Sequence, residues 1–143
     1  MEGLDTAIAP LVVAMNRVPF IATLSSCGGH PEESSVREYG YAVANVVFDL
    51  KDEAENAIRW LGMVQDVLRA RKAERPRSEH AFIFAKKFCL NQDGYLTWQW
   101  DLKIQATGKN PAECRAGLDD GIAFLTSYFN KAGGNYNSIE EVN

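Results

Sequence analysis

A hairpin signal in the C-terminal half of the chain constrains its fold more than any other feature. Residues Tyr95 to Ala106 alternate between apolar and polar side chains, which is the period of a strand with one buried face. The segment His80 to Leu90 precedes them, and the sequence Asn-Gln-Asp-Gly lies between the two. An Asp-Gly pair supplies the positive φ that a tight turn requires. The sequence therefore predicts an antiparallel hairpin with strands His80–Leu90 and Tyr95–Ala106.

The second strand of this hairpin has one apolar and one polar face. The apolar face carries Leu96, Trp98, Trp100, Leu102 and Ile104, and the polar face carries Tyr95, Thr97, Gln99, Asp101 and Lys103. We expect the apolar side chains, both tryptophans included, to lie in the core rather than to stack on nucleic-acid bases. The polar face is then wet or lines a site, and Asp101, like Asp49 in an earlier strand, is a carboxylate that needs a partner.

A short helix and two strands are predicted before the hairpin. Residues from about Thr6 to Val18 have a helical apolar face made of Ile8, Leu11, Val12 and Met15. Pro10 places the first turn at Ala9 or Pro10, and Pro19 ends the helix. Phe20 to Leu24 is a short strand. The valine-rich run Tyr41 to Leu50 is nearly continuously apolar, which is typical of a strand covered on both faces or close to it.

Two longer helices complete the prediction. Asp52 to about Ala73 has an apolar stripe of Ala57, Leu61, Val64 and Leu68, widened by Ile58, Trp60 and Val67. Asn110 and Pro111 open the second helix as an N-cap and a proline at the first position. This helix runs to about Lys131, where Gly133 and Gly134 end it. Its buried residues are expected to be Cys114, Leu118, Ile122, Leu125 and Phe129.

The element order α-β-β-α-β-β-α predicts an α+β fold, a two-layer sandwich of a mainly antiparallel sheet with helices on one face. The length of 143 residues fits one globular domain, which we assign to residues 1–134. The polar residues 135–143 are expected to form a flexible C-terminal tail.

Composition and charge limit the possible functions. The net charge of −4 argues against a general nucleic-acid-binding protein. The longest apolar runs fall short of the roughly 18 residues that span a bilayer, and the acidic N-terminus lacks the positive region of a secretory signal. We therefore expect a cytoplasmic protein without a membrane partner. Its three cysteines are expected to be free thiols, with Cys89 and Cys114 in the core and Cys27 outside it.

The hexapeptide Ser25-Ser26-Cys27-Gly28-Gly29-His30 is the candidate site, and three chemical readings of it remain open beside that of a simple turn. Cys27 and His30 are close enough in sequence to touch, as a nucleophilic thiol and its base would. The same pair has the spacing of metal ligands. However, the other soft donors, His80, Cys89 and Cys114, are scattered singly, so we expect no structural zinc even if Glu33 or Asp49 could complete a site.

The third reading is a binding loop, and we favour it over the first two. Two glycines let backbone amides approach an anion closely, and Ser25, Ser26 and His30 add donors. We therefore predict that all six residues line a site for an anionic or nucleotide-like small molecule, covered by the polar segment 31–40. A separate basic cluster, Arg69, Arg71, Lys72, Arg75 and Arg77, could contact the phosphates of an RNA, although such residues also complement a helix C-terminus.

The run from Ile8 to His30 resembles the N-terminal signature of the wybutosine-synthesising methylase family, which makes a modified guanine in tRNA. Five positions match: Asn16, Ser25, Ser26, Cys27 and Gly29. Leu24, Gly28 and His30 stand where that family has threonine, serine and arginine. The resulting Ser-Cys-x-Gly-His motif is also similar to that of small uncharacterised bacterial and phage proteins. The resemblance implies, as the alternative function, an RNA- or nucleotide-modifying methyltransferase that uses S-adenosylmethionine.

Overall fold

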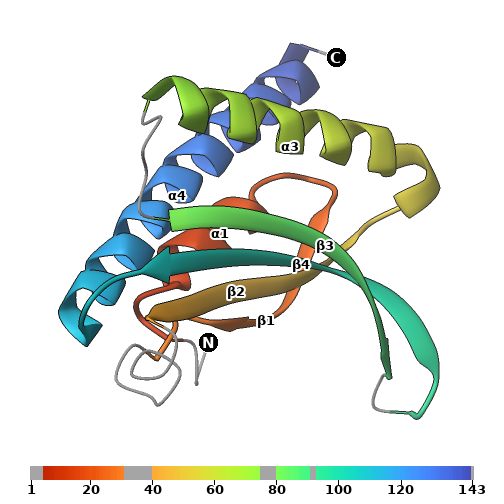
Figure 1. The fold of residues 1–143 in the computed structure, drawn as a ribbon. Coiled ribbons are helices and arrows are strands. Elements are labelled where there is room, and N and C mark those ends of the chain that lie inside the picture. The colour runs from red at the N-terminus through yellow and green to blue at the C-terminus, as the bar shows by residue number, and fades with distance from the viewer. Residues whose placement is uncertain (1–4, 31–39, 75–79, 91–92, 143) are drawn as a thin grey trace.

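The computed structural model describes residues 5–30, 40–74, 80–90 and 93–142. Along these residues the elements follow the predicted order: α1 (Ala9–Asn16), β1 (Ile21–Cys27), β2 (Tyr41–Leu50), α3 (Glu53–Glu74), β3 (His80–Leu90), β4 (Leu96–Thr107) and α4 (Pro111–Val142). The strands form one antiparallel sheet in the order β1-β2-β4-β3, so that β1 and β3 are its edges (Figure 1). The predicted α+β fold and the predicted hairpin are confirmed.

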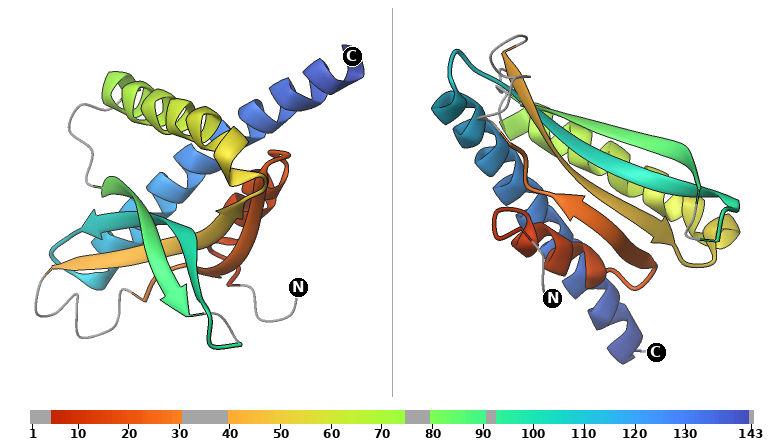
Figure 2. Two further views of the ribbon diagram at one scale, coloured as in Figure 1. Left: turned by 90° about the vertical axis from the view of Figure 1, so that its right-hand side faces the viewer. Right: turned by 90° about the horizontal axis from the view of Figure 1, so that it is seen from below.

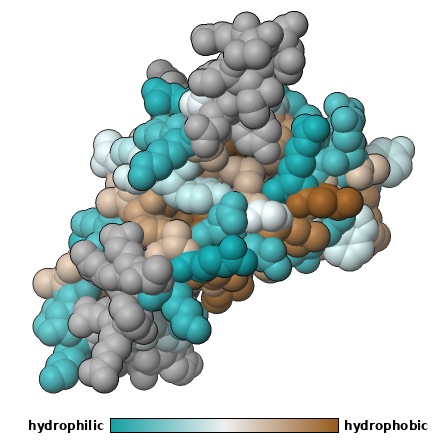
Figure 3. All heavy atoms as spheres, turned by 90° about the horizontal axis from the view of Figure 1, so that it is seen from above, coloured by the Kyte–Doolittle hydropathy of each residue, from teal (hydrophilic) through white to brown (hydrophobic). Residues whose placement is uncertain are grey.

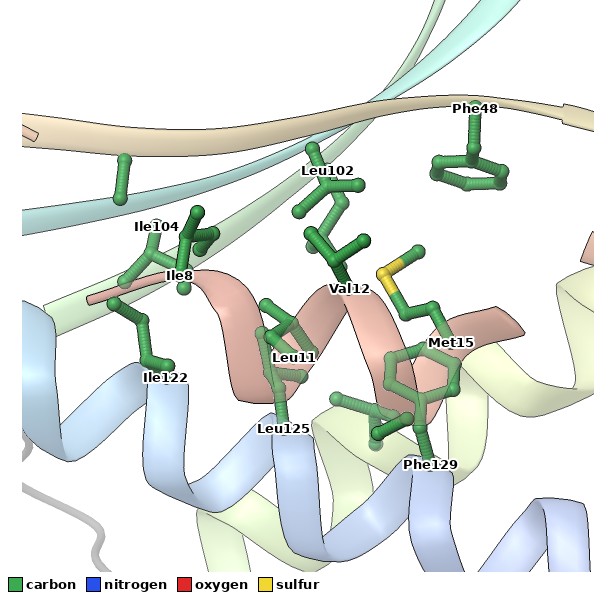
Figure 4. Close-up of a cluster of buried hydrophobic side chains, with 14 of the residues drawn as sticks. Ile8, Leu11, Val12, Met15, Phe48, Leu102, Ile104, Ile122, Leu125 and Phe129 are labelled. Atoms are coloured by element: carbon green, nitrogen blue, oxygen red, sulfur yellow. The ribbon is translucent and has the colours of Figure 1, made fainter. Parts of the chain in front are cut away.

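The helices lie on one side of the sheet, and the core is the space between the two layers (Figure 2). Alternate residues of β2 and β4, among them Phe48, Leu102 and Ile104, point toward α1 and α4 (Figure 4). All of the apolar residues predicted for the buried faces of α1 and α4 are buried. At about 1.5–3 kcal/mol for each large side chain removed from water, this interior is the main source of stability.

Trp60 of α3 lies at the centre of an aromatic cluster. Its ring stacks on Phe129 of α4, with centroids 6.3 Å apart, and meets the edge of Phe48 of β2 at 4.8 Å. Phe84 and Trp100 approach the same ring at 5.9 and 6.0 Å. One side chain of α3 therefore contacts both the sheet and the second long helix.

The apolar stripe predicted for α3 is wrong in part. Trp60 and Val67 are buried and Val64 is half-buried, as expected, but Ile58, Leu61 and Leu68 are exposed. The contacts of Trp60 determine which face of the helix turns inward, and that face also carries the polar residues Asn56 and Arg71. The prediction used only the spacing of hydrophobic residues. Because such residues occur on two sides of this helix, their spacing did not identify the buried side.

The core predicted for the hairpin is also wrong at its turn end. Leu102 and Ile104 are buried and Trp100 is half-buried, but Leu96 and Trp98 are exposed, the latter by 52%. The turn end of the hairpin extends beyond the helices, so none of the described elements forms a second layer over it (Figure 1). Trp98 packs instead on Phe88 of the neighbouring strand, with ring centroids 4.7 Å apart. Cys89, expected in the core, is half-buried at the same end.

Two further expectations differ from the structure. Among the described residues, the helices cover one face of the run Tyr41–Leu50, and its other face is half-buried. The helix α4 continues through Gly133 and Gly134 to Val142, so the segment expected to be a tail is helical. A side chain at Gly133 would come within 3.0 Å of Arg17 Cβ, which shows that this glycine allows the end of α1 to pack closely on α4. Among the described residues, no helix is long and apolar enough to cross a membrane.

Candidate functional site

A β-bulge decides where the candidate hexapeptide points. Thr23 pairs with Phe48, but the next pair is Ser25 with Val47, so Leu24 is an extra residue in β1. Because side chains alternate between the faces of a sheet, one extra residue moves every later side chain to the opposite face. Cys27 therefore lies opposite Asn45, on the face that the helices do not cover. We call this surface the open face.

The sequence indicated a single loop for the hexapeptide, but its first half is part of a strand. Ser25, Ser26 and Cys27 belong to β1, which was expected to end at Leu24. The two serines are neighbours in a strand, so their hydroxyl groups point to opposite faces and do not converge. The segment expected to cover the site, together with Glu33, lies mostly outside the described residues.

Each of the two glycines has a structural role. The N–H of Gly28 donates to Asp5 Oδ2 at 3.3 Å, and the other oxygen of that carboxylate accepts from the N–H of Ala7 at 2.9 Å. Gly29 has φ +92°, and a Cβ there would lie 2.5 Å from Leu118 Cδ1. The amide of Gly28 that was expected to hold an anion is therefore bonded to a carboxylate of the chain itself.

Cys27 and His30 are in contact. The Sγ atom of the half-buried Cys27 lies 3.3 Å from Nε2 of the exposed His30. A thiol and an imidazole at this distance can share a proton, and both can also bind a ligand. By contrast, burial and the charge of Glu113 raise the pKa of the Cys114 thiol, which keeps that cysteine protonated and unreactive.

A polar cluster extends from Cys27 across the open face, and we call its members Asn45, Lys87, Asp101 and Lys103 the open-face cluster. Asn45 Nδ2 donates to Asp101 Oδ1 at 3.1 Å. The ammonium group of Lys87 lies 2.6 Å from Asp101 Oδ2, and that of Lys103 lies 3.7 Å from the same oxygen. Although Asp101 is on the open face, these neighbours leave it only 1% exposed.

The electrostatics of the open-face cluster favour an anion. A buried carboxylate is stable only with charged or hydrogen-bonding partners, and Asp101 has both kinds. Its hydrogen bond with Lys87 raises the pKa of that ammonium group, so Lys87 is fully charged at neutral pH. Two ammonium groups facing one carboxylate leave one positive charge in excess. Asp101 therefore has its partners within the protein, which answers the question that the sequence raised.

Asp49 lies on the same face, one strand position before the end of β2, opposite Ala22. Burial and the nearby charge of Glu53 raise the pKa of its carboxyl group. The carboxylate of Glu53 in turn forms an ion pair with Lys86. The carboxyl group of Asp49 thus lies near another carboxylate, whereas that of Asp101 lies near two ammonium groups.

Several of the other sites proposed from sequence are not assembled. Within the described ranges, no three His, Cys, Asp or Glu side chains are grouped closely enough to hold a metal ion. His80 lies on the helical side, where its Nδ1 is 3.3 Å from Arg71 Nη2. Cys114 is buried in α4, and Cys89 lies near the hairpin turn.

The basic cluster does not present all its charges to an RNA. Arg71 is buried, 3.1 Å from Asp120 Oδ2, with its guanidinium 5.2 Å from the ring centre of Phe124. It points into the protein because it lies on the same helix face as Trp60, and it lines a pocket of about 360 Å³ between α3 and α4. Arg69 and Lys72 are exposed, and Arg75 and Arg77 lie outside the described residues.

Sequence reasoning missed Asn45 and Lys87 as site residues, and it placed Lys103 on a face that could line a site without assigning it a role. Two signals were available: Asn45 interrupts the apolar run 42–48, and Lys103 shares a face with Asp101 through the alternation of β4. The link to Cys27 could not be found in this way, because it depends on the bulge at Leu24.

The chain matches no family model, no curated protein and no solved structure. The resemblance of residues 8–30 to the methylase family therefore stays a prediction. Function is argued below from the contacts and charges of the open face.

Proposed function

We propose that this protein is a ligand-binding domain, and that the open face between His30 and Lys103 binds a small anionic, nucleotide-like molecule. The observation that carries the proposal is the excess positive charge of the open-face cluster, beside the paired Cys27 and His30. A sheet surface with charged donors at fixed positions can bind the phosphate of such a molecule through charge-assisted hydrogen bonds.

The residues have separate roles in this proposal. Lys103 is farther from Asp101 than Lys87 is, at 3.7 against 2.6 Å. It can therefore turn toward a phosphate and lose less of its attraction to Asp101 than Lys87 would. Lys87 and Asn45 hold Asp101 in place. His30 is exposed at the end of β1 and can donate to an anion, while Cys27 fixes the orientation of its ring.

Methyl transfer to RNA or a nucleotide is the second candidate function. The contact between Cys27 Sγ and His30 Nε2 favours it, because a thiol beside a base can take part in group transfer. On this alternative, S-adenosylmethionine would bind to the same face. The two candidates therefore differ in which probe binds rather than in where it binds.

Isothermal titration calorimetry with ATP, inorganic phosphate and S-adenosylmethionine tests both candidates. We expect ATP to bind, with an affinity that falls as salt is added. The variant Lys103→Met should weaken binding about tenfold, the effect of one charge-assisted hydrogen bond. Binding of S-adenosylmethionine that is lost in Cys27→Ser, with no ATP binding, would favour the methyltransferase.

Lys131→Met is the matched control, because Lys131 is an exposed lysine on α4, away from the open face. It should bind ATP as the wild type does. If no probe binds, or if Lys131→Met weakens binding as much as Lys103→Met, the open face is not the ligand site.

A further inference from the structure

The exposed side of α3 carries apolar residues at the spacing of a helix–helix seam. Ile58, Leu61 and Leu68 are 80%, 54% and 47% exposed, and with Gln65 they follow the intervals three, four and three. These are the intervals of positions a and d in a helical heptad. Apolar residues are visible among hydrophilic ones on the side of the molecule where α3 lies (Figure 3). The stripe is separate from the inward face that carries Trp60.

We propose that a second copy of this chain packs against this stripe, with the two α3 helices antiparallel and related by a two-fold axis. In this register Ile58 lies beside Leu68 of the second copy, and Leu61 lies beside Gln65 of the second copy. By symmetry each contact occurs twice, so the apolar residues at both ends of the seam are covered. The open face of the sheet is not used in this interface.

The charges that flank the seam fit an antiparallel partner. Glu55 and Arg69 are exposed and lie on the same side of the stripe, at equivalent positions two heptads apart. The antiparallel register brings Glu55 opposite Arg69 of the second copy, twice by symmetry. A parallel arrangement would place like charges together.

Gly62 supports the same register independently. Glycine is among the least favourable residues in a helix interior. No described atom lies within 4 Å of where its Cβ would be, so no contact within the chain requires a glycine there. In the antiparallel register, Gly62 lies midway between Glu55 and Arg69 and therefore meets Gly62 of the second copy at the two-fold axis. The lack of a side chain at this point lets the two backbones approach closely.

Sedimentation equilibrium of the full chain tests the interface. We expect the wild type to form a dimer, and Leu61→Asp to be a monomer with an unchanged circular dichroism spectrum. Glu55→Arg and Arg69→Glu should each raise the dimer dissociation constant about fivefold or more. The double variant Glu55→Arg/Arg69→Glu should return to within about twofold of the wild type, because the exchanged charges pair again.

Oxidative cross-linking provides the second test. Gly62→Cys should form a covalent dimer on mild oxidation, since its two thiols would meet at the axis. The control is Gly134→Cys, another exposed helical glycine with open space at its Cβ, treated in parallel with the wild type. A wild type that stays monomeric contradicts the proposal. So does a double charge variant as weak as the single ones, or equal cross-linking of both cysteine variants.

Discussion

Asn16 and Thr23 are joined by two hydrogen bonds: Asn16 Nδ2 donates to Thr23 Oγ1 at 2.8 Å, and Asn16 Oδ1 accepts from the Thr23 N–H at 3.1 Å. The side chain of the last residue of α1 thus holds β1, an edge strand, immediately before its bulge. Its position fixes the strand that carries Cys27.

Removing this link should weaken the fold. We expect Asn16→Ala to lower the free energy of unfolding by about 1–2 kcal/mol, the sum of two partly exposed hydrogen bonds. Urea denaturation measures the change. Asn130→Ala, which removes a single hydrogen bond from Arg17, is the control and should cost less. An Asn16→Ala variant no weaker than that control would show that β1 is held by its strand pairing alone.

The tryptophans should differ sharply in their contribution to stability. Trp60→Ala empties the centre of the aromatic cluster and should lower the free energy of unfolding by about 3–5 kcal/mol. Trp98→Ala removes an exposed ring that contacts Phe88 and should cost no more than about 1.5 kcal/mol. Thermal or urea unfolding of both variants checks this. Equal losses would mean that the hairpin turn is covered in solution.

The ion pair of Lys87 with Asp101 should make stability fall in alkaline solution. The pKa of Lys87 is raised by its bond to Asp101, so the folded protein holds this proton more tightly than the unfolded chain does. The stabilisation is complete below the ordinary value of 10.5 and is lost as the pH rises through the folded pKa. Urea midpoints measured from pH 9 to 11.5 should decline less in Lys87→Met than in the wild type. Parallel curves would contradict this.

Asp49 should be a source of instability at neutral pH. Burial and Glu53 raise its pKa, so the folded state favours the protonated carboxyl, and this contribution to stability is lost as the pH rises through the folded pKa. Asp49→Asn should therefore raise the melting temperature at pH 7. The difference should vanish below the ordinary pKa of 3.8, where the wild-type carboxyl is also neutral. A lower melting temperature at pH 7 would show that the charge is stabilised by a contact.

The fold could be predicted from the sequence because its signals are local and periodic. The alternation of Leu102 and Ile104 and the helical spacing of Leu118 and Leu125 each point to one face, and both faces are buried. The same reasoning failed for Leu61 and Trp98, because periodicity does not say where a neighbouring layer ends or which of two apolar faces of a helix it covers.

The candidate site could be predicted only in part, since its geometry is set by contacts distant in sequence. The closeness of Cys27 and His30 follows from their spacing in the chain. By contrast, Asn45 and Asp101 are 56 residues apart in the chain. Gly28 donates its N–H to Asp5, which lies before α1. No local pattern encodes such pairs. The six hexapeptide residues do not converge as predicted, because Ser25 and Ser26 lie in a strand, where adjacent side chains point to opposite faces.

The bulge at Leu24 decides on which side of the sheet Cys27 lies. If β1 were regular and Leu24 paired with Val47, Cys27 would lie opposite Ala44 instead of Asn45, and its thiol would point toward the helices. The side on which this thiol is accessible therefore depends on one residue of β1 being left out of the pairing with β2. Loss of the bulge with Leu24 retained would leave the strand order unchanged and turn the thiol from the open face to the helical one.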